Sequence, residues 1–91
     1  MKKITLEEIE YEVVKDHKEG FDAESVTERY TEYFHPFDYI LGDWAYGKLR
    51  LKGFYKKDHK NCKPINNYEN VEKHLKNNCA YDCRYFILEK K

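Results

Sequence analysis

The stretch that decides the fold covers residues 38–55 and reads DYILGDWAYGKLRLKGFY. A short apolar run opens it, a cluster of glycine and aromatic residues follows, and alternating apolar and basic residues close it. Alternation with a period of two is typical of a half-buried strand, and a glycine-containing connection between two such runs predicts a β-hairpin. We therefore expect strands at 39–41 and 48–55, a turn at 42–47, and a bulge at Gly53, since glycine inside a strand often marks one.

The rest of the chain predicts two further strands and two helices. A strand-like alternation covers residues 9–15, and a helical apolar spacing covers 23–35, ahead of a proline that cannot continue a helix. A polar loop precedes a second helix over 66–77, and a last strand covers 84–89. The residues expected to face inward from the two helices are Ala23, Val26, Tyr30, Tyr33 and Phe34 in the first, and Tyr68, Val71 and Leu75 in the second.

The order of these elements is β-α-β-β-α-β, in a single domain that covers residues 1–91. It predicts an α+β fold with a small, mostly antiparallel sheet and two helices. We expect the ferredoxin-like arrangement, in which both helices cover one face of a four-stranded sheet. The alternative is a looser α+β fold in which the first strand lies at an edge and the N-terminus adds a hairpin.

The charges of the chain are unevenly divided, although 17 basic and 17 acidic residues give a net charge of zero. Residues 1–43 carry five Lys/Arg and twelve Asp/Glu (5 − 12 = −7), and residues 44–91 carry twelve and five (12 − 5 = +7). Such asymmetry is typical either of a site for a polyanion or of two halves that attract each other in the fold.

The location of the protein is indicated by three features of the sequence. No apolar run approaches the roughly 20 residues that span a bilayer. The N-terminus lacks the apolar stretch of a signal peptide. An odd number of cysteines, three, indicates reduced thiols rather than a disulfide framework. We expect a cytoplasmic protein that does not bind membranes.

Four segments carry a resemblance to a known family, namely residues 11–16, 18–21, 79–88 and the Gly-Asp-Trp-x-Tyr-Gly-x-Leu-Arg-Leu segment at 42–51. They resemble the YutD family, which consists of short proteins from low-GC Gram-positive bacteria. The resemblance extends over nearly the whole chain. It implies an α+β fold and supplies no catalytic residues that could be transferred to this sequence.

Basic and aromatic residues are interleaved between 44 and 63, where seven Lys/Arg stand against one Asp. Basic groups neutralise phosphates and aromatic rings stack on unpaired bases. The leading hypothesis is therefore a non-enzymatic binding module for RNA or single-stranded DNA. The residues expected to make the contact are Trp44, Tyr46, Lys48, Arg50, Lys52, Phe54, Tyr55, Lys56 and Lys57.

Two other kinds of site fit the sequence. Trp44 and Tyr46 at a hairpin tip are suited to anchor a protein partner, which would make the protein an adaptor, unless Trp44 folds back into the core.

Thiolate and imidazole groups are zinc ligands, and the candidates in this chain are Cys62, His74, Cys79 and Cys83. Their spacing departs from the usual Cys-x-x-Cys pairs, and cysteine is equally common as a small buried residue. No cofactor other than zinc is indicated.

An enzyme is not expected. The single serine, Ser25, falls in a predicted helix without a nucleophile turn, and no glycine-rich loop of the phosphate-binding type is present.

Overall fold

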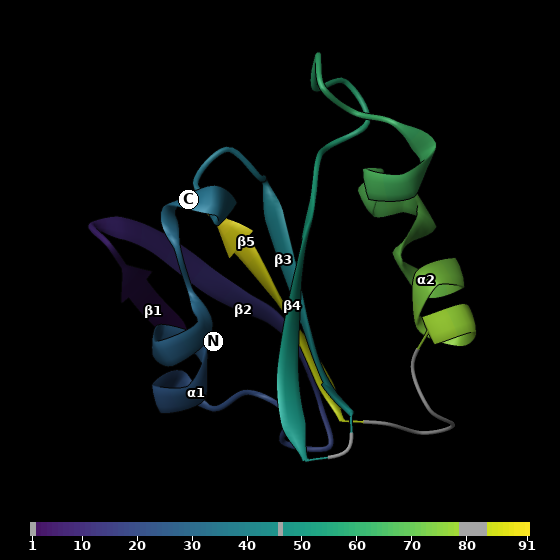
Figure 1. The fold of residues 1–91 in the computed structure, drawn as a ribbon. Helices are drawn as coiled ribbons and strands as arrows, with labels where there is room; N and C mark the ends of the chain where they lie inside the picture. The colour runs from purple at the N-terminus through teal and green to yellow at the C-terminus, as the bar shows by residue number, and fades with distance from the viewer. Residues whose placement is uncertain (1, 46, 79–83) are drawn as a thin grey trace.

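The computed structural model describes residues 2–45, 47–78 and 84–91. Within them, five strands form one sheet in the order β1-β2-β5-β3-β4, and all neighbouring strands are antiparallel (Figure 1). The elements are β1 (Lys3–Leu6), β2 (Ile9–His17), α1 (Ala23–Arg29), β3 (Tyr39–Ala45), β4 (Lys48–Phe54), α2 (Val71–Asn78) and β5 (Tyr85–Lys90), with 3₁₀ turns at Glu32–Phe34, Pro64–Asn66 and Tyr68–Asn70. No helix in these ranges is long and apolar enough to cross a membrane.

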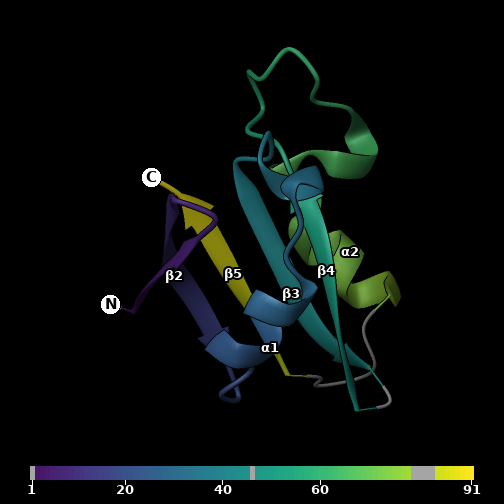
Figure 2. The same ribbon diagram turned by 60° about the vertical axis from the view of Figure 1, so that its left-hand side comes forward.

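The α+β prediction is confirmed, but the ferredoxin-like arrangement is wrong. The sheet contains a fifth strand, because β1 and β2 form a hairpin at the N-terminus, as the looser alternative supposed. The helices α1 and α2 lie on opposite faces of the sheet instead of sharing one, which gives three layers (Figure 2). The last strand, β5, lies at the centre of the sheet between β2 and β3.

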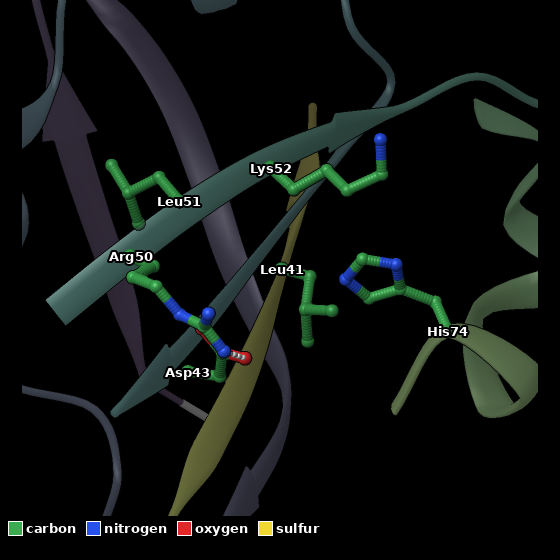
Figure 3. A pocket seen from close by; sticks show the side chains of 6 residues that line it. All are labelled: Leu41, Asp43, Arg50, Leu51, Lys52 and His74. Carbon is green, nitrogen blue, oxygen red and sulfur yellow. Dashed lines mark hydrogen bonds and ion pairs between the residues drawn. The ribbon is translucent and has the colours of Figure 1, made fainter. Parts of the chain in front are cut away.

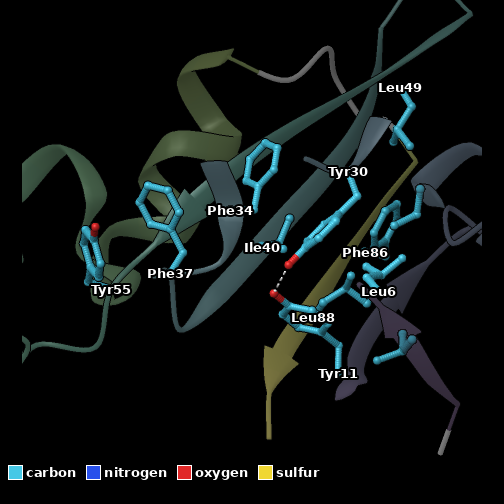
Figure 4. Close-up of a cluster of buried hydrophobic side chains, with 12 residues drawn as sticks. Leu6, Tyr11, Tyr30, Phe34, Phe37, Ile40, Leu49, Tyr55, Phe86 and Leu88 are labelled. Atoms are coloured by element: carbon cyan, nitrogen blue, oxygen red, sulfur yellow. Dashed lines mark hydrogen bonds between the residues drawn. The ribbon is translucent and has the colours of Figure 1, made fainter. Parts of the chain in front are cut away.

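Each face of the sheet carries its own core. The buried residues of the α1-side core (Figure 4) are Leu6, Tyr11, Val13, Val26, Tyr30, Phe34, Phe37, Ile40, Leu49, Tyr55, Phe86 and Leu88. Those of the α2-side core are Leu41, Phe54, Val71 and Ile87, with Tyr39, Tyr68 and Leu75 partly buried against them. The inner strands β3 and β5 each contribute to both cores because successive side chains of a strand point to opposite faces.

The first helix ends at Arg29, six residues before the predicted end at His35. Tyr30 leaves the helical conformation (ψ 134°), and its hydroxyl lies 2.7 Å from that of Tyr11 in the buried α1-side core (Figure 4). A separate 3₁₀ turn then directs Phe34 inward. Tyr33, which was predicted to face inward, is 67% exposed, because the interruption after Arg29 breaks the helical spacing on which that prediction rested.

The hairpin of β3 and β4 is confirmed, but β3 continues to Ala45, so Gly42 and Asp43 are strand residues rather than turn residues. The predicted bulge at Gly53 is also wrong, since the register of the two strands is continuous there. Glycine is needed at 42 and 53 for another reason: a Cβ atom would overlap the ring of Phe86 at the first and of Phe37 at the second. The register shift in this sheet lies in β2, between Val13 and Lys15.

The α2-side core makes stability sensitive to alkaline pH through Tyr39. This residue stacks on Tyr68 and donates a hydrogen bond to Glu89 (3.0 Å), and burial together with that bond raises its pKa to about 12. The folded protein therefore holds this proton more tightly than the unfolded chain, whose tyrosines titrate near pH 10. The contribution of the protonated Tyr39 hydroxyl to the free energy of unfolding is complete below about pH 10 and is lost as the pH rises towards 12.

We expect the Tyr39→Phe variant to lose stability less steeply than the native protein between about pH 10 and pH 12. Urea unfolding at a series of pH values measures the slope. Tyr33→Phe, a change at an exposed tyrosine, is the matched control and should follow the native curve. Parallel curves for the native protein and Tyr39→Phe would contradict the argument.

Candidate functional site

The strand β4 forms one edge of the sheet, and along Lys48–Phe54 its one partner among the described strands is β3. Its side chains alternate between the two faces. Leu49 and Leu51 pack towards the α1-side core, whereas Arg50 and Lys52 lie on the α2 side with the buried Phe54. This edge therefore presents apolar groups to one face and basic groups to the other.

On the α2 side, a hollow of about 190 Å³ opens beside the edge (Figure 3), and we call it the α2-side hollow. Its lining residues are Leu41, Asp43, Arg50, Leu51, Lys52 and His74. The guanidinium of Arg50 donates two hydrogen bonds to the carboxylate of Asp43, at 2.7 and 3.1 Å. Asp43 is only 5% exposed, so this ion pair compensates a buried charge.

Besides the ion pair, the α2-side hollow is lined by two leucines, Leu41 and Leu51, and by two groups that can carry a positive charge, Lys52 and His74. Lys52 extends over the ring of Phe54, with its Nζ 5.3 Å from the ring centre. Burial, and then the neighbouring charge of Lys52, lower the pKa of His74. The negative charge of Asp43 is matched by Arg50, so Lys52 gives the hollow a positive charge that suits an anionic group.

On the α1 side, a second hollow of about 260 Å³ borders the same edge, and we call it the α1-side hollow. Its lining residues are Tyr33, Phe37, Leu51, Lys52, Gly53, Ile65 and Asn66. Tyr33 and Ile65 are 67% and 73% exposed, unusually high for large apolar side chains. The sequence interpretation did not identify either residue as part of a site, although Ile65 is the one large aliphatic residue in the polar segment 56–67.

The residues proposed for nucleic-acid binding do not form the expected face of stacked rings. Phe54 and Tyr55 are buried in different cores, which contradicts their role as stacking rings. Trp44 is half-buried, and its indole N–H donates to the carbonyl oxygen of Gly20 (2.7 Å). Its face is covered by the Arg84 guanidinium, 4.9 Å from the ring centre. Tyr46 lies outside the described residues.

The basic members of that proposal are better placed for binding. The side chains of Lys48, Lys56 and Lys57 are exposed, and Arg50 is half-exposed despite its pairing with Asp43. The interpretation of Trp44 as a free anchor at the hairpin tip is wrong, because the indole hydrogen bond ties it to the loop before α1.

The proposed zinc ligands are not brought together in the part of the chain that the structure describes. Cys62 packs against the α1-side core, whereas His74 lies in the α2-side hollow on the other face. Cys79 and Cys83 fall outside the described residues. Among the residues that are described, no three His, Cys, Asp or Glu side chains are grouped closely enough to hold a metal ion.

The geometry defines a small three-layer α+β domain in which the β4 edge of the sheet lies between two hollows. A family model described as "Putative antitoxin YutD-like" matches residues 5–89. The chain belongs to this YutD-like family.

A sequence comparison and a structure comparison both agree with this assignment. A Bacillus subtilis (strain 168) protein described as "Putative antitoxin YutD" is 33% identical over 87 residues, which cover 96% of each chain. The solution NMR structure of YutD from B. subtilis superimposes with a TM-score of 0.83 at 32% identity. That match covers 100% of this chain and 83% of the other.

Proposed function

We propose that this protein is a non-enzymatic binding module of the antitoxin type, which binds a protein partner along the β4 edge. The description of the matching family as a putative antitoxin supports a partner protein whose activity this protein would block. The observation that carries the proposal is the pair of exposed apolar side chains, Tyr33 and Ile65, on the rim of the α1-side hollow.

The two side chains matter because they belong to one surface. Single exposed apolar residues are common on soluble proteins, but a contiguous apolar patch with a polar rim is typical of an interaction site. Tyr33 and Ile65 line the same hollow with Leu51, and Lys52 and Asn66 supply polar groups beside them. Aromatic and aliphatic side chains of this kind act as anchors when a partner excludes water around them.

RNA or single-stranded DNA is the second candidate ligand, supported by the exposed Lys48, Lys56 and Lys57. These groups can neutralise phosphates. The support is weaker than for a protein partner, because burial of Phe54 and Tyr55 removes stacking that is worth about 1–3 kcal/mol per base.

The proposal predicts that Ile65→Asp abolishes capture of the partner without unfolding the protein. The side chain is already exposed, so the fold should tolerate the change, whereas burying a carboxylate against the partner is costly. Tagged native and variant proteins would be used to capture partners from a lysate of the source organism. The captured protein would then be produced separately and its affinity measured by calorimetry.

Ala23→Asp is the matched control. Ala23, which was predicted to face inward, is exposed in the first turn of α1 and lines neither hollow, so the change adds the same charge outside the proposed site. We expect the control to bind as the native protein does and Ile65→Asp to bind at least about tenfold more weakly. A partner that binds both variants equally would contradict this site, and recovery of nucleic acid alone would favour the second candidate.

A further inference from the structure

We propose that the partner binds as an additional strand on the outer edge of β4, through an extended segment in which apolar and acidic residues alternate. This inference rests on the protein-binding function proposed above. It adds the geometry of the contact and the chemistry of the partner.

The backbone of β3 shows which groups of β4 point outward. The Trp44 N–H donates to the carbonyl oxygen of Arg84 (3.1 Å), so even-numbered residues of β3 direct their backbone groups towards β5. The odd-numbered residues of β3 are then directed towards β4, because these directions alternate along a strand. Asp43 pairs with Arg50 in the register, which leaves Leu49, Leu51 and Gly53 with N–H and C=O groups directed away from the sheet.

The end of β4 confirms this direction. The Tyr55 N–H donates to the carbonyl oxygen of Asn66 (2.7 Å), and the Tyr68 N–H donates to that of Tyr55 (3.0 Å). The chain itself thus pairs with the outward side of the edge at Tyr55, in a parallel bridge to Asn67. An incoming strand would form backbone hydrogen bonds with the same outward side of β4 over residues 49–53. Strand addition of this kind is a recurrent mode of peptide recognition.

The two hollows specify the side chains of the incoming strand. They lie on opposite faces of the edge and share Leu51 and Lys52 in their linings. Successive side chains of an added strand would enter them alternately. One set would meet Tyr33 and Ile65 and should be apolar. The other set would meet Lys52, whose charge the Asp43–Arg50 ion pair leaves uncompensated, and should be acidic.

The same charges disfavour a second copy of this chain as the occupant. If two β4 edges paired antiparallel around Leu51, Arg50 of each copy would lie opposite Lys52 of the other. Like charges directly opposite each other destabilise strand pairs, and basic residues on edge strands are a common protection against self-association. An acidic segment removes this repulsion.

The test uses the full-length protein labelled with ¹⁵N and a blocked peptide of about ten alternating valine and glutamate residues. We expect hydrogen exchange of the Leu49, Leu51 and Gly53 amides to slow by at least about tenfold at saturation. The Tyr55 amide, which is already hydrogen-bonded, serves as an internal reference and should change little. A peptide of alternating valine and lysine should leave all four amides unchanged.

Charge reversal tests the recognition of the acidic residues. Lys52→Glu should weaken binding of the valine–glutamate peptide by about tenfold or more, whereas Lys57→Glu, outside the strand, is the matched control and should bind nearly as the native protein does. Unchanged exchange at Leu49, Leu51 and Gly53 would overturn strand addition, as would a short oligouridine RNA that binds where the peptide does not.

The outcomes separate this inference from the proposed function. If Ile65→Asp loses the captured partner but the peptide gives no protection along β4, the protein-binding function stands and strand addition is wrong. If capture is also independent of Ile65, both are wrong.

Discussion

Replacing Gly42 with alanine is expected to lower the free energy of unfolding by about 2–3 kcal/mol, near the upper end for overpacked cores. Gly42 lies in the middle of β3, opposite Phe86 of β5. A Cβ atom at this position would overlap the ring of Phe86, which is fully buried and packs edge-on against Phe21 at 5.4 Å between ring centres. The ring has little room to move, so the strands would have to separate.

Urea unfolding followed by circular dichroism measures this loss. Adding Phe86→Leu to the Gly42→Ala variant should restore part of the stability, since a smaller side chain leaves room for the new methyl group. Gly42→Ala and Phe86→Leu would then be non-additive, as expected for residues in contact. A Gly42→Ala variant as stable as the native protein would show that the backbone adjusts without cost.

Replacing Arg50 with glutamine is expected to cost about 2–3 kcal/mol, because the buried carboxylate of Asp43 loses its charged partner. Removing one member of a fully buried ion pair costs about 3–5 kcal/mol. The guanidinium of Arg50 is half-exposed, so water can reach the vacated position and the expected loss is smaller.

The double variant Asp43→Asn/Arg50→Gln should recover most of the stability, since two neutral amides can replace the ion pair. Lys48→Gln removes a charge at an exposed position of the same strand and should change stability by less than about 0.5 kcal/mol. Equal losses for the single and double variants would contradict the role of Asp43. Since Arg50 stabilises the fold through Asp43, a charge reversal at Arg50 would lower stability as well as any binding of an acidic partner. Lys52 is therefore the better position at which to test binding alone.

The hairpin of β3 and β4 illustrates what could be predicted from local pattern. The alternation from Lys48 onward correctly assigned a strand with Leu49 and Leu51 on one face and the basic residues on the other. The extent of β3 was misjudged because Gly42 and Asp43 are typical turn residues. Both serve distant contacts instead, Gly42 with Phe86 and Asp43 with Arg50.

The arrangement of the helices was misjudged although a signal was present. The run Phe86-Ile87-Leu88 is apolar without alternation, which is typical of a strand buried on both faces. It implied a helix on each side of the sheet. Phe86 and Leu88 do face α1, and Ile87 faces α2.

The candidate site was found in part. The basic residues of β4 were correctly expected on one face of that strand. Phe54, however, is covered by Val71 and His74 of α2, and the ring of Tyr55 packs against Phe37 and His59. Tyr33 and Ile65 are 32 residues apart in sequence and meet at one hollow only after folding. No local pattern could have paired them.

The sequence by itself determined the type of each main element except β1, which it missed, and the alternation of basic and apolar groups along β4, because these depend on the period of neighbouring residues. The tertiary structure alone decided the strand order, the burial of Phe54 and Tyr55, and the two hollows that share Leu51 and Lys52. Those features depend on which distant segment covers each face, and the free energy of that choice comes from burial and contacts between residues far apart in the chain.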